Sequence, residues 1–225
     1  MGLQLVAQTD DFSSIGFGLL GPETSITSGL QGLFSLNADA ANAVFNYSSR
    51  GSVAPSIVGS PTIDQTGLVT NQTNYVNFNF APSGDRTVAI VFYVDATAVG
   101  FPLSSFTPGD YEYLQITSTD VVLVVNGVSS RIIPKTAGRA DMYVIAVKDF
   151  ASLELYRPRD KISSKVEVGG SQTHSQNYRT GAQSDNSPTK SMLFAYWNRT
   201  LTSAEIDTFY AEMKAYLSDF GVATI

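Results

Sequence analysis

Two carboxylates, Asp110 and Glu112, come nearest in this chain to a catalytic arrangement. Hydrolysis of a glycosidic bond needs two carboxylates facing each other across that bond, about 5–9 Å apart. Residues i and i+2 of a strand share one face, so these side chains would point the same way. No third carboxylate follows on this stretch: the residue three positions after Glu112 is Gln115, an amide. We interpret the pair as the polar edge of a strand and expect no catalytic residues.

His174 is the only histidine, so a Ser-His-Asp site could form only around it. The Gly-x-Ser-x-Gly turn that presents the serine in many hydrolases is absent from the sequence. His174 lies in residues 171–191, the most polar stretch of the chain. A loop of this length is usually functional or mobile. We therefore expect His174 to be exposed to solvent.

The elements that would position these residues are short strands joined by polar turns. Residues 74–80 alternate between apolar and polar, which predicts a half-buried strand, whereas residues 86–95 are apolar on both faces, which predicts a central one. Asn126-Gly127 between two β-rich runs predicts a hairpin. Further strands are expected at 32–36, 142–147, 153–156 and 166–168, and residues 46–60 are expected to be loop.

The end of the chain predicts a strand, a turn and a capped helix in that order. Met192–Trp197 is apolar and aromatic, and Thr202 to Glu205 has the spacing of a capping box. Apolar residues then recur at helical spacing, and Gly221 is expected to end the helix. The expected buried stripe consists of Ile206, Phe209, Tyr210, Met213, Tyr216, Leu217 and Phe220.

Composition limits the classes of protein this chain can represent. With 225 residues, 43% hydrophobic and 15% charged, it predicts one globular domain at 29–225 after an N-terminal arm or lead-in at 1–28. It has no cysteine, and no apolar run reaches the roughly 18–20 residues that span a membrane. The net charge of −6 argues against nucleic acid as a partner.

The charges are unevenly distributed along the sequence. Residues 131–165 carry eight Lys and Arg against four acids, whereas residues 1–130 carry two against ten. The basic segment could bind anionic glycans or an acidic neighbouring subunit. The simpler interpretation is ordinary solvated strand faces.

The order of these features resembles that of laminin G-like, concanavalin A-like lectin and glucanase domains over about residues 30–218. Gly32-Leu33-Phe34 is similar to the family's first strand, Gly67 precedes the aromatic strand at Tyr75-Val76, and Trp197-Asn198-Arg199-Thr200-Leu201 precedes the capped helix. The resemblance implies an all-β fold, a concanavalin A-like jelly-roll β-sandwich of two antiparallel sheets with a short C-terminal helix. It also implies that Trp197 is a core residue.

Hydrolases of this family usually carry a Glu-x-Asp-x-x-Glu strand, which this chain lacks. Glycan binding in this fold uses aromatic platforms beside Asn, Asp and Arg side chains. Candidates here are Asn177, Tyr178, Arg179, Gln183, Asp185 and Asn186 in the polar stretch, and Tyr111 with Tyr113. Some relatives hold calcium through loop Asp and Asn residues, which makes Asp185 and Asn186 an alternative metal site. We expect no metal and no cofactor.

The composition, which lacks cysteine and is rich in Ser, Thr, Asn and Gly, is similar to that of receptor-binding and decorating proteins of tailed bacteriophages. It implies a non-enzymatic, lectin-like virion structural protein, of the tail-fibre or capsid-decoration type. Its partners would be host glycan, other virion proteins and further copies of itself in a homo-oligomer, with no nucleic acid and no membrane insertion. Its location would be the virion. Alternatives are a polysaccharide hydrolase of the same fold and a cellular carbohydrate-binding module.

Overall fold

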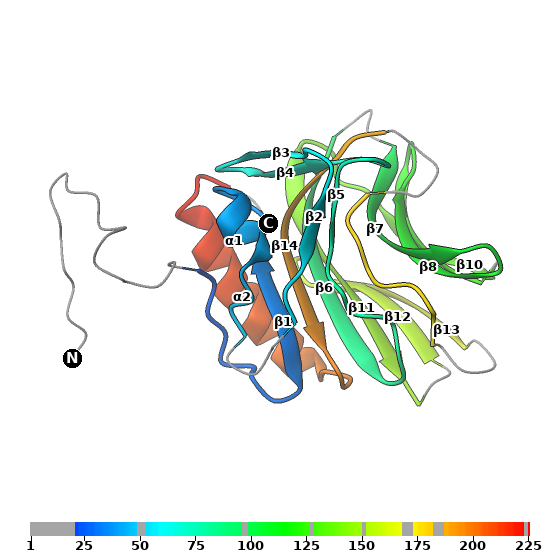
Figure 1. Ribbon diagram of the computed structural model, residues 1–225. Helices are drawn as coiled ribbons and strands as arrows, with labels where there is room; N and C mark the ends of the chain where they lie inside the picture. Colours follow the sequence, from blue (N-terminus) through cyan, green and yellow to red (C-terminus); the bar gives the residue numbers. More distant parts are fainter. Residues whose placement is uncertain are drawn as a thin grey trace, which may run out of the picture.

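The structure, a computed structural model, describes residues 21–48, 53–95, 99–126, 128–149, 152–167, 173–181, 187–222 and 225. Eight antiparallel strands form a large sheet in the order β13-β12-β11-β6-β14-β4-β3, with β1 also paired to β14 (Figure 1). These strands are β1 (Leu30–Ser35), β3 (Thr62–Asp64), β4 (Gly67–Thr70), β6 (Arg86–Val94), β11 (Arg139–Lys148), β12 (Ser152–Arg157), β13 (Ile162–Glu167) and β14 (Thr189–Trp197).

A small sheet faces the large one across the sandwich. It has the order β10-β9-β8-β7, and a short pair, β2 and β5, extends it. Arg179 makes that extension, because its backbone bridges both Asn77 and Ser104. These strands are β2 (Ser56–Val58), β5 (Tyr75–Asn77), β7 (Gly100–Thr107), β8 (Asp110–Ile116), β9 (Asp120–Val125) and β10 (Val128–Pro134).

The central strand β6 shows how the sequence builds two cores. Val88, Ile90 and Phe92 point between the sheets into the first core, where the rings of Phe78 and Phe194 also stack with centroids 3.7 Å apart. The alternate residues, such as Val91, point to the other side of the large sheet and join a second core. A strand that is apolar on both faces is therefore covered on both faces, as the sequence predicts.

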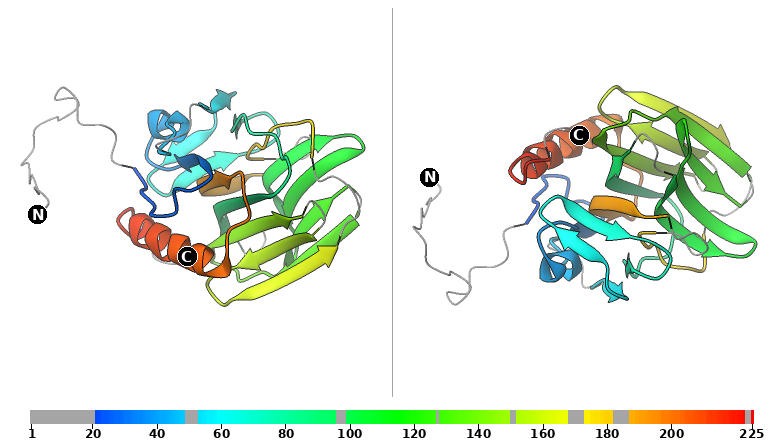
Figure 2. Two further views of the ribbon diagram at one scale, coloured as in Figure 1. Left: turned by 90° about the horizontal axis from the view of Figure 1, so that it is seen from below. Right: turned by 90° about the horizontal axis from the view of Figure 1, so that it is seen from above.

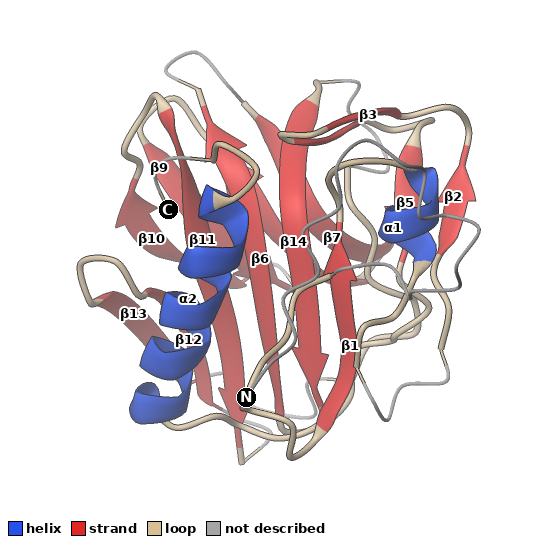
Figure 3. Ribbon diagram, turned by 90° about the vertical axis from the view of Figure 1, so that its left-hand side faces the viewer, coloured by secondary structure: helices blue, strands red, loops and turns tan. Residues whose placement is uncertain are grey.

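Helix α2 (Ser203–Ser218) covers the second core and gives the molecule its third layer (Figures 2 and 3). Its capping box between Thr202 and Glu205 is present, as predicted. Phe209 packs edge-on against the Trp197 indole at 4.8 Å, and both side chains are buried. Full burial of an aromatic residue of this kind contributes about 1.5–3 kcal/mol. In the described part of the chain, no helix has the length and apolar character needed to cross a membrane.

These elements confirm the expected β-sandwich with its C-terminal helix, the hairpin at Asn126 and the core position of Trp197. Sequence reasoning missed β7, because this strand places Ser104 and Ser105 at buried positions. It was also wrong to expect only loop at 46–60, where β2 forms. Helix α1 (Ala40–Val44), a short helix capped by Asp39, was not expected either.

The expected N-terminal arm is described only from residue 21 onward. Residues 24–26 pack against the domain: the hydroxyls of Thr24 and Ser25 both donate to Glu212 of α2, at 2.6 Å each. The Trp197 indole N–H donates to the carbonyl of Ile26 at 2.9 Å. This end of the expected arm therefore belongs to the helix-covered side of the sandwich. Residues 1–20 lie outside the described part.

Candidate functional site

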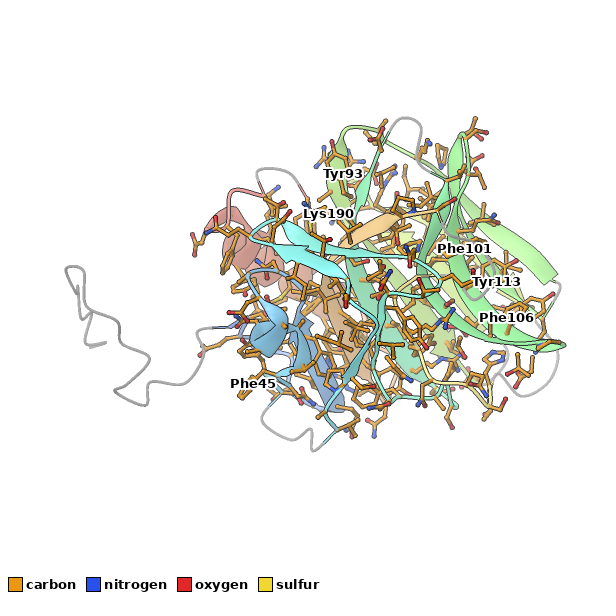
Figure 4. All side chains as sticks on the ribbon, turned by 45° about the horizontal axis from the view of Figure 1, so that its top comes forward. Phe45, Tyr93, Phe101, Phe106, Tyr113 and Lys190 are labelled. Carbon is orange, nitrogen blue, oxygen red and sulfur yellow. The ribbon has the colours of Figure 1, made fainter. Side chains whose placement is uncertain are left out.

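Four partly exposed aromatic side chains form a continuous strip on the outer face of the small sheet. The aromatic strip consists of Phe101, Phe106, Tyr111 and Tyr113, contributed by the neighbouring strands β7 and β8. Its ring centroids are 5.3 Å apart between Phe101 and Tyr113, 5.7 Å between Tyr113 and Tyr111, and 5.2 Å between Tyr111 and Phe106. Figure 4 shows Phe101, Tyr113 and Phe106 following one another along this face.

Strand alternation explains why the strip is exposed. Leu114 and Ile116 on β8 are fully buried between the sheets, so Tyr111 and Tyr113 point outward. Neither phenol hydroxyl makes a hydrogen bond to another described residue. Partial burial, with Tyr111 close by, raises the pKa of Tyr113 above its ordinary value, so its hydroxyl keeps its proton at neutral pH. The strip therefore offers flat apolar rings beside free hydroxyl groups.

Arg179 extends this surface toward β5. It pairs with Ser104, and Ser104 pairs with Tyr113, so the three residues lie in one row across the sheet. Two strand spacings separate Arg179 from Tyr113, about 10 Å. The guanidinium lies over the ring of Tyr75, 4.3 Å from its centroid, and among the described residues no acid pairs with it. Its Nε and Nη2 are buried and make no hydrogen bond there, so Arg179 meets solvent only through the rest of its partly exposed side chain.

Tyr178 occupies a different place from the surface position that sequence reasoning gave it. Its side chain is fully buried and points into the core, next to Phe194 and Tyr196. The hydroxyl donates to Glu112, which also forms a buried ion pair with Arg86. Burial raises the pKa of Tyr178 well above its ordinary value, so it stays neutral. It joins the two sheets and cannot serve as an exposed platform.

His174 is buried as well, with 1% of its surface exposed, so the expectation that it faces solvent was wrong. Its Nδ1 lies 2.6 Å from Asp110 and donates to that carboxylate, while Nε2 lies 3.6 Å from Glu112. The backbone N–H of Ser175 and the His174 side chain both hold the pKa of Asp110 below its usual range. The imidazole therefore fastens the polar segment to β8.

The polar segment is accordingly part of the small sheet where it is described. The backbone N–H of Tyr178 donates to the carbonyl of Phe80, and Arg179 and Ser104 exchange backbone hydrogen bonds. The Ser105 hydroxyl donates to the carbonyl of Gln176. Over residues 173–181, the expected exposed loop instead lies between β5 and β7 and is joined to both through isolated β-bridges at Arg179. The reason is the long-range pairing, which the local sequence does not indicate.

The remaining expected site residues divide into two groups. Asn177 is half-buried next to Tyr178, in the segment between β5 and β7. Gln183, Asp185 and Asn186 lie outside the described residues, and with them the alternative calcium site. Within the described ranges, no group of three His, Cys, Asp or Glu side chains is placed to hold a metal ion.

Phe101, Phe106 and Tyr75 are site residues that sequence reasoning missed. The aromatic residues Phe101 and Phe106 stand on either side of the buried Ser104-Ser105 pair, five residues apart. Residues five apart in a regular strand lie on opposite faces, and a helical repeat would space them three or four apart. Phe101 and Phe106 share a face because the register of β7 shifts between Gly100 and Leu103. A usable signal was the density of aromatic residues between positions 101 and 113.

The basic segment 131–165 is largely neutralised within the molecule. Arg139 and Arg159 both contact the buried carboxylate of Asp141, and Arg157 pairs with Asp160 at 2.7 Å. Lys161 and Lys165 pair with Asp207 and Glu154, at 3.2 and 3.3 Å. These internal pairs favour the structural interpretation of the segment over a surface for anionic ligands.

No family model matches this sequence, and no curated protein matches it. Among solved structures, the receptor-binding domain of botulinum neurotoxin D is similar, with a TM-score of 0.63, 14% identity, and coverage of 84% of this chain and 54% of that one. The serotype D ligand-binding domain in complex with N-acetylneuraminic acid has a TM-score of 0.66, 11% identity, and coverage of 83% and 52%. A Trypanosoma rangeli sialidase has a TM-score of 0.60, 18% identity, and coverage of 82% and 33%.

This chain spans about half the length of the neurotoxin domains and about a third of the sialidase. At such low identity the likeness concerns the fold and leaves ligands and activities open. The chain shares the antiparallel β-sandwich fold of these proteins.

Proposed function

We propose that this protein is a non-enzymatic glycan-binding domain that uses the aromatic strip together with Arg179. The observation that carries the proposal is the uninterrupted run of four partly exposed rings on one sheet face. A sugar ring has an apolar face that stacks on an aromatic ring, and hydroxyl edges that need hydrogen-bond partners. The hydroxyls of Tyr111 and Tyr113, which make no hydrogen bond to another described residue, supply such partners, and the partly exposed Arg179 adds positive charge beside the strip.

The carboxylate pair on β8 supports a binding role over hydrolysis. Glu112 is fully buried and already paired with Arg86 and Tyr178, and Asp110 is bonded to His174 and Ser175. A general acid or nucleophile must reach the glycosidic bond. Because Glu112 has no exposed surface, we assign the pair a structural role.

The wider setting that we propose is the virion of a tailed phage, with the chain in a homo-oligomer beside other virion proteins. Support for this setting comes from the composition of the sequence, which lacks cysteine and is rich in Ser, Thr, Asn and Gly. Repeated copies would suit a shallow strip, because linked weak sites gain avidity of about 10²–10⁴. Native mass by light scattering tests this part, and a monomer would contradict it.

The glycan proposal is tested by titrating the protein with oligosaccharides selected on a glycan array. Replacing both strip tyrosines, Tyr111→Ala with Tyr113→Ala, should weaken binding at least about tenfold, the equivalent of about 1.4 kcal/mol. Phe45→Ala is the matched control, since Phe45 is 46% exposed and lies away from the strip in Figure 4. Unchanged binding by the double variant, or release of shortened oligosaccharides by the wild type, would contradict the proposal.

A further inference from the structure

A hollow of about 380 Å³ opens on the helix-covered side of the large sheet, beyond the end of α2. A second hollow of about 200 Å³ shares two of its wall residues, Tyr93 and Lys190. Figure 4 places these two side chains near each other and apart from the labelled rings of the aromatic strip. Ligand sites usually measure about 300–1,000 Å³. The first hollow is lined by Thr66, Tyr93, Ala140, Lys190, Met192 and Val222.

Tyr93 gives this hollow an open aromatic wall. Its side chain projects from β6 on the side of α2 and is 38% exposed, among the most exposed large apolar residues described. Its neighbour on β11 is the small Ala140, which leaves space beside the ring. Met192 and Val222 add apolar walls. An exposed aromatic face between apolar walls fits the C–H face of a sugar ring.

Lys190 gives the same hollow an oriented hydrogen-bond donor. Its Nζ lies 3.1 Å from Asp64, and it also donates to the hydroxyl of Thr66. Thr66 in turn donates to Asp64 at 2.7 Å, so the ammonium group is held from two sides. An ammonium group has three N–H donors. Asp64 and Thr66 orient these donors, and the ammonium group, on a side chain that is 27% exposed, can also donate to a ligand in the hollow.

The charges around the hollow favour an uncharged ligand. The positive charge of Lys190 is matched by Asp64, whose pKa is held below its usual range chiefly by the Thr66 hydroxyl. Helix α2 ends at Ser218, beside this hollow, and the carbonyl end of a helix carries partial negative charge. An anionic group would gain no free cation here and would face that negative helix end.

We infer that this hollow is a second carbohydrate site, which binds one neutral pyranose unit with its ring stacked on Tyr93 and a hydroxyl accepting from Lys190. The site lies on the opposite side of the sandwich from the aromatic strip, so it goes beyond the function proposed above. The two sites also differ in shape. A hollow of this size that is open to solvent on one side takes a single unit or a chain end, whereas a flat strip takes a stretch of glycan.

The test is an NMR titration of the full chain with neutral methyl pyranosides and, separately, with N-acetylneuraminic acid. We expect neutral glycosides to shift the backbone amide signals of Thr66, Lys190 and Val222. Tyr93→Ala should weaken this binding at least about tenfold, and Lys190→Met about as much. Tyr93→Phe, which keeps the ring, is the matched control and should bind within about threefold of wild type.

Three results would overturn the inference: no shift at these amides at millimolar sugar, shifts confined to strip residues, or stronger binding of N-acetylneuraminic acid. The double variant Tyr111→Ala with Tyr113→Ala separates the two sites. Loss of glycan binding at the strip, with the amide shifts of Thr66, Lys190 and Val222 retained, supports two independent sites. If these three shifts are absent in wild type while strip binding persists, the second site fails and the proposed function stands. The amide shifts are measured in wild type, so the test does not depend on the folding of any variant.

Discussion

The outer faces of the two sheets both carry aromatic side chains, but these are covered on the large sheet and partly exposed on the small one. On the large sheet, Trp197 and its apolar neighbours are fully covered by α2 and form a second core. On the small sheet, Tyr111, Tyr113 and two phenylalanines stay partly exposed, because no described element covers them. Aromatic residues on a strand therefore indicate an apolar face, and the presence or absence of a covering helix decides whether that face becomes core or stays partly exposed.

This comparison predicts that removing one aromatic ring from each face lowers the free energy of unfolding by unequal amounts. Phe209→Ala should lower the free energy of unfolding by about 3–5 kcal/mol, because it leaves a cavity beneath α2. Tyr113→Ala should cost only about 0.2–1 kcal/mol, the usual contribution of a cross-strand pair. Urea denaturation of both variants measures the difference. Equal losses would mean that the strip is a part of the core.

A second prediction concerns the two faces of a single strand. Glu112 lies between Tyr111 and Tyr113 but points inward, where it pairs with the buried Arg86. Glu112→Gln should destabilise the protein by about 2–3 kcal/mol, because Arg86 loses the charged acceptor of its hydrogen bond. Glycan binding per folded molecule should not change. Glu154→Gln is the matched control, since its pair with Lys165 lies at the surface, with side chains 27% and 63% exposed, and its loss should cost below about 1 kcal/mol.

The smallest effect is expected at the capping box, which holds the helix over the large sheet. Arg199 and the backbone N–H of Thr202 lower the pKa of Glu205 from its ordinary 4.5 to about 2. A carboxylate whose pKa is lower in the folded state than in the unfolded chain stabilises the folded state at pH values above the unfolded pKa. For Glu205 this stabilisation is lost as the pH falls from 4.5 toward about 2.

Glu205→Gln should therefore remove part of this acid sensitivity, at a cost near neutral pH of about 1 kcal/mol. Denaturant midpoints compared between neutral and acidic pH measure the effect. Asp110 and Asp160 also have lowered pKa values, so some acid sensitivity should persist. A variant with the full sensitivity of the wild type would show that the capping box does not contribute to it.

Local sequence determined much of this molecule. The capping box, the glycine that ends α2 and the turn at Asn126 each depend on contacts within a few residues, and they form as the sequence predicts. The two apolar faces of β6 likewise required a layer on each side. In these cases the physical cause lies within one element, so it can be read from that element alone.

Tertiary structure decided the candidate site. His174 and Tyr178 lie in a strongly polar segment, yet both are buried, because backbone hydrogen bonds place the segment between β5 and β7 and bring acceptors on β8 to their side chains. Phe101 meets Tyr113 only when β7 pairs with β8, and Tyr93 meets Lys190 only across β6 and β14. Burial and neighbours across strands depend on partners distant in the chain, and no local pattern encodes them.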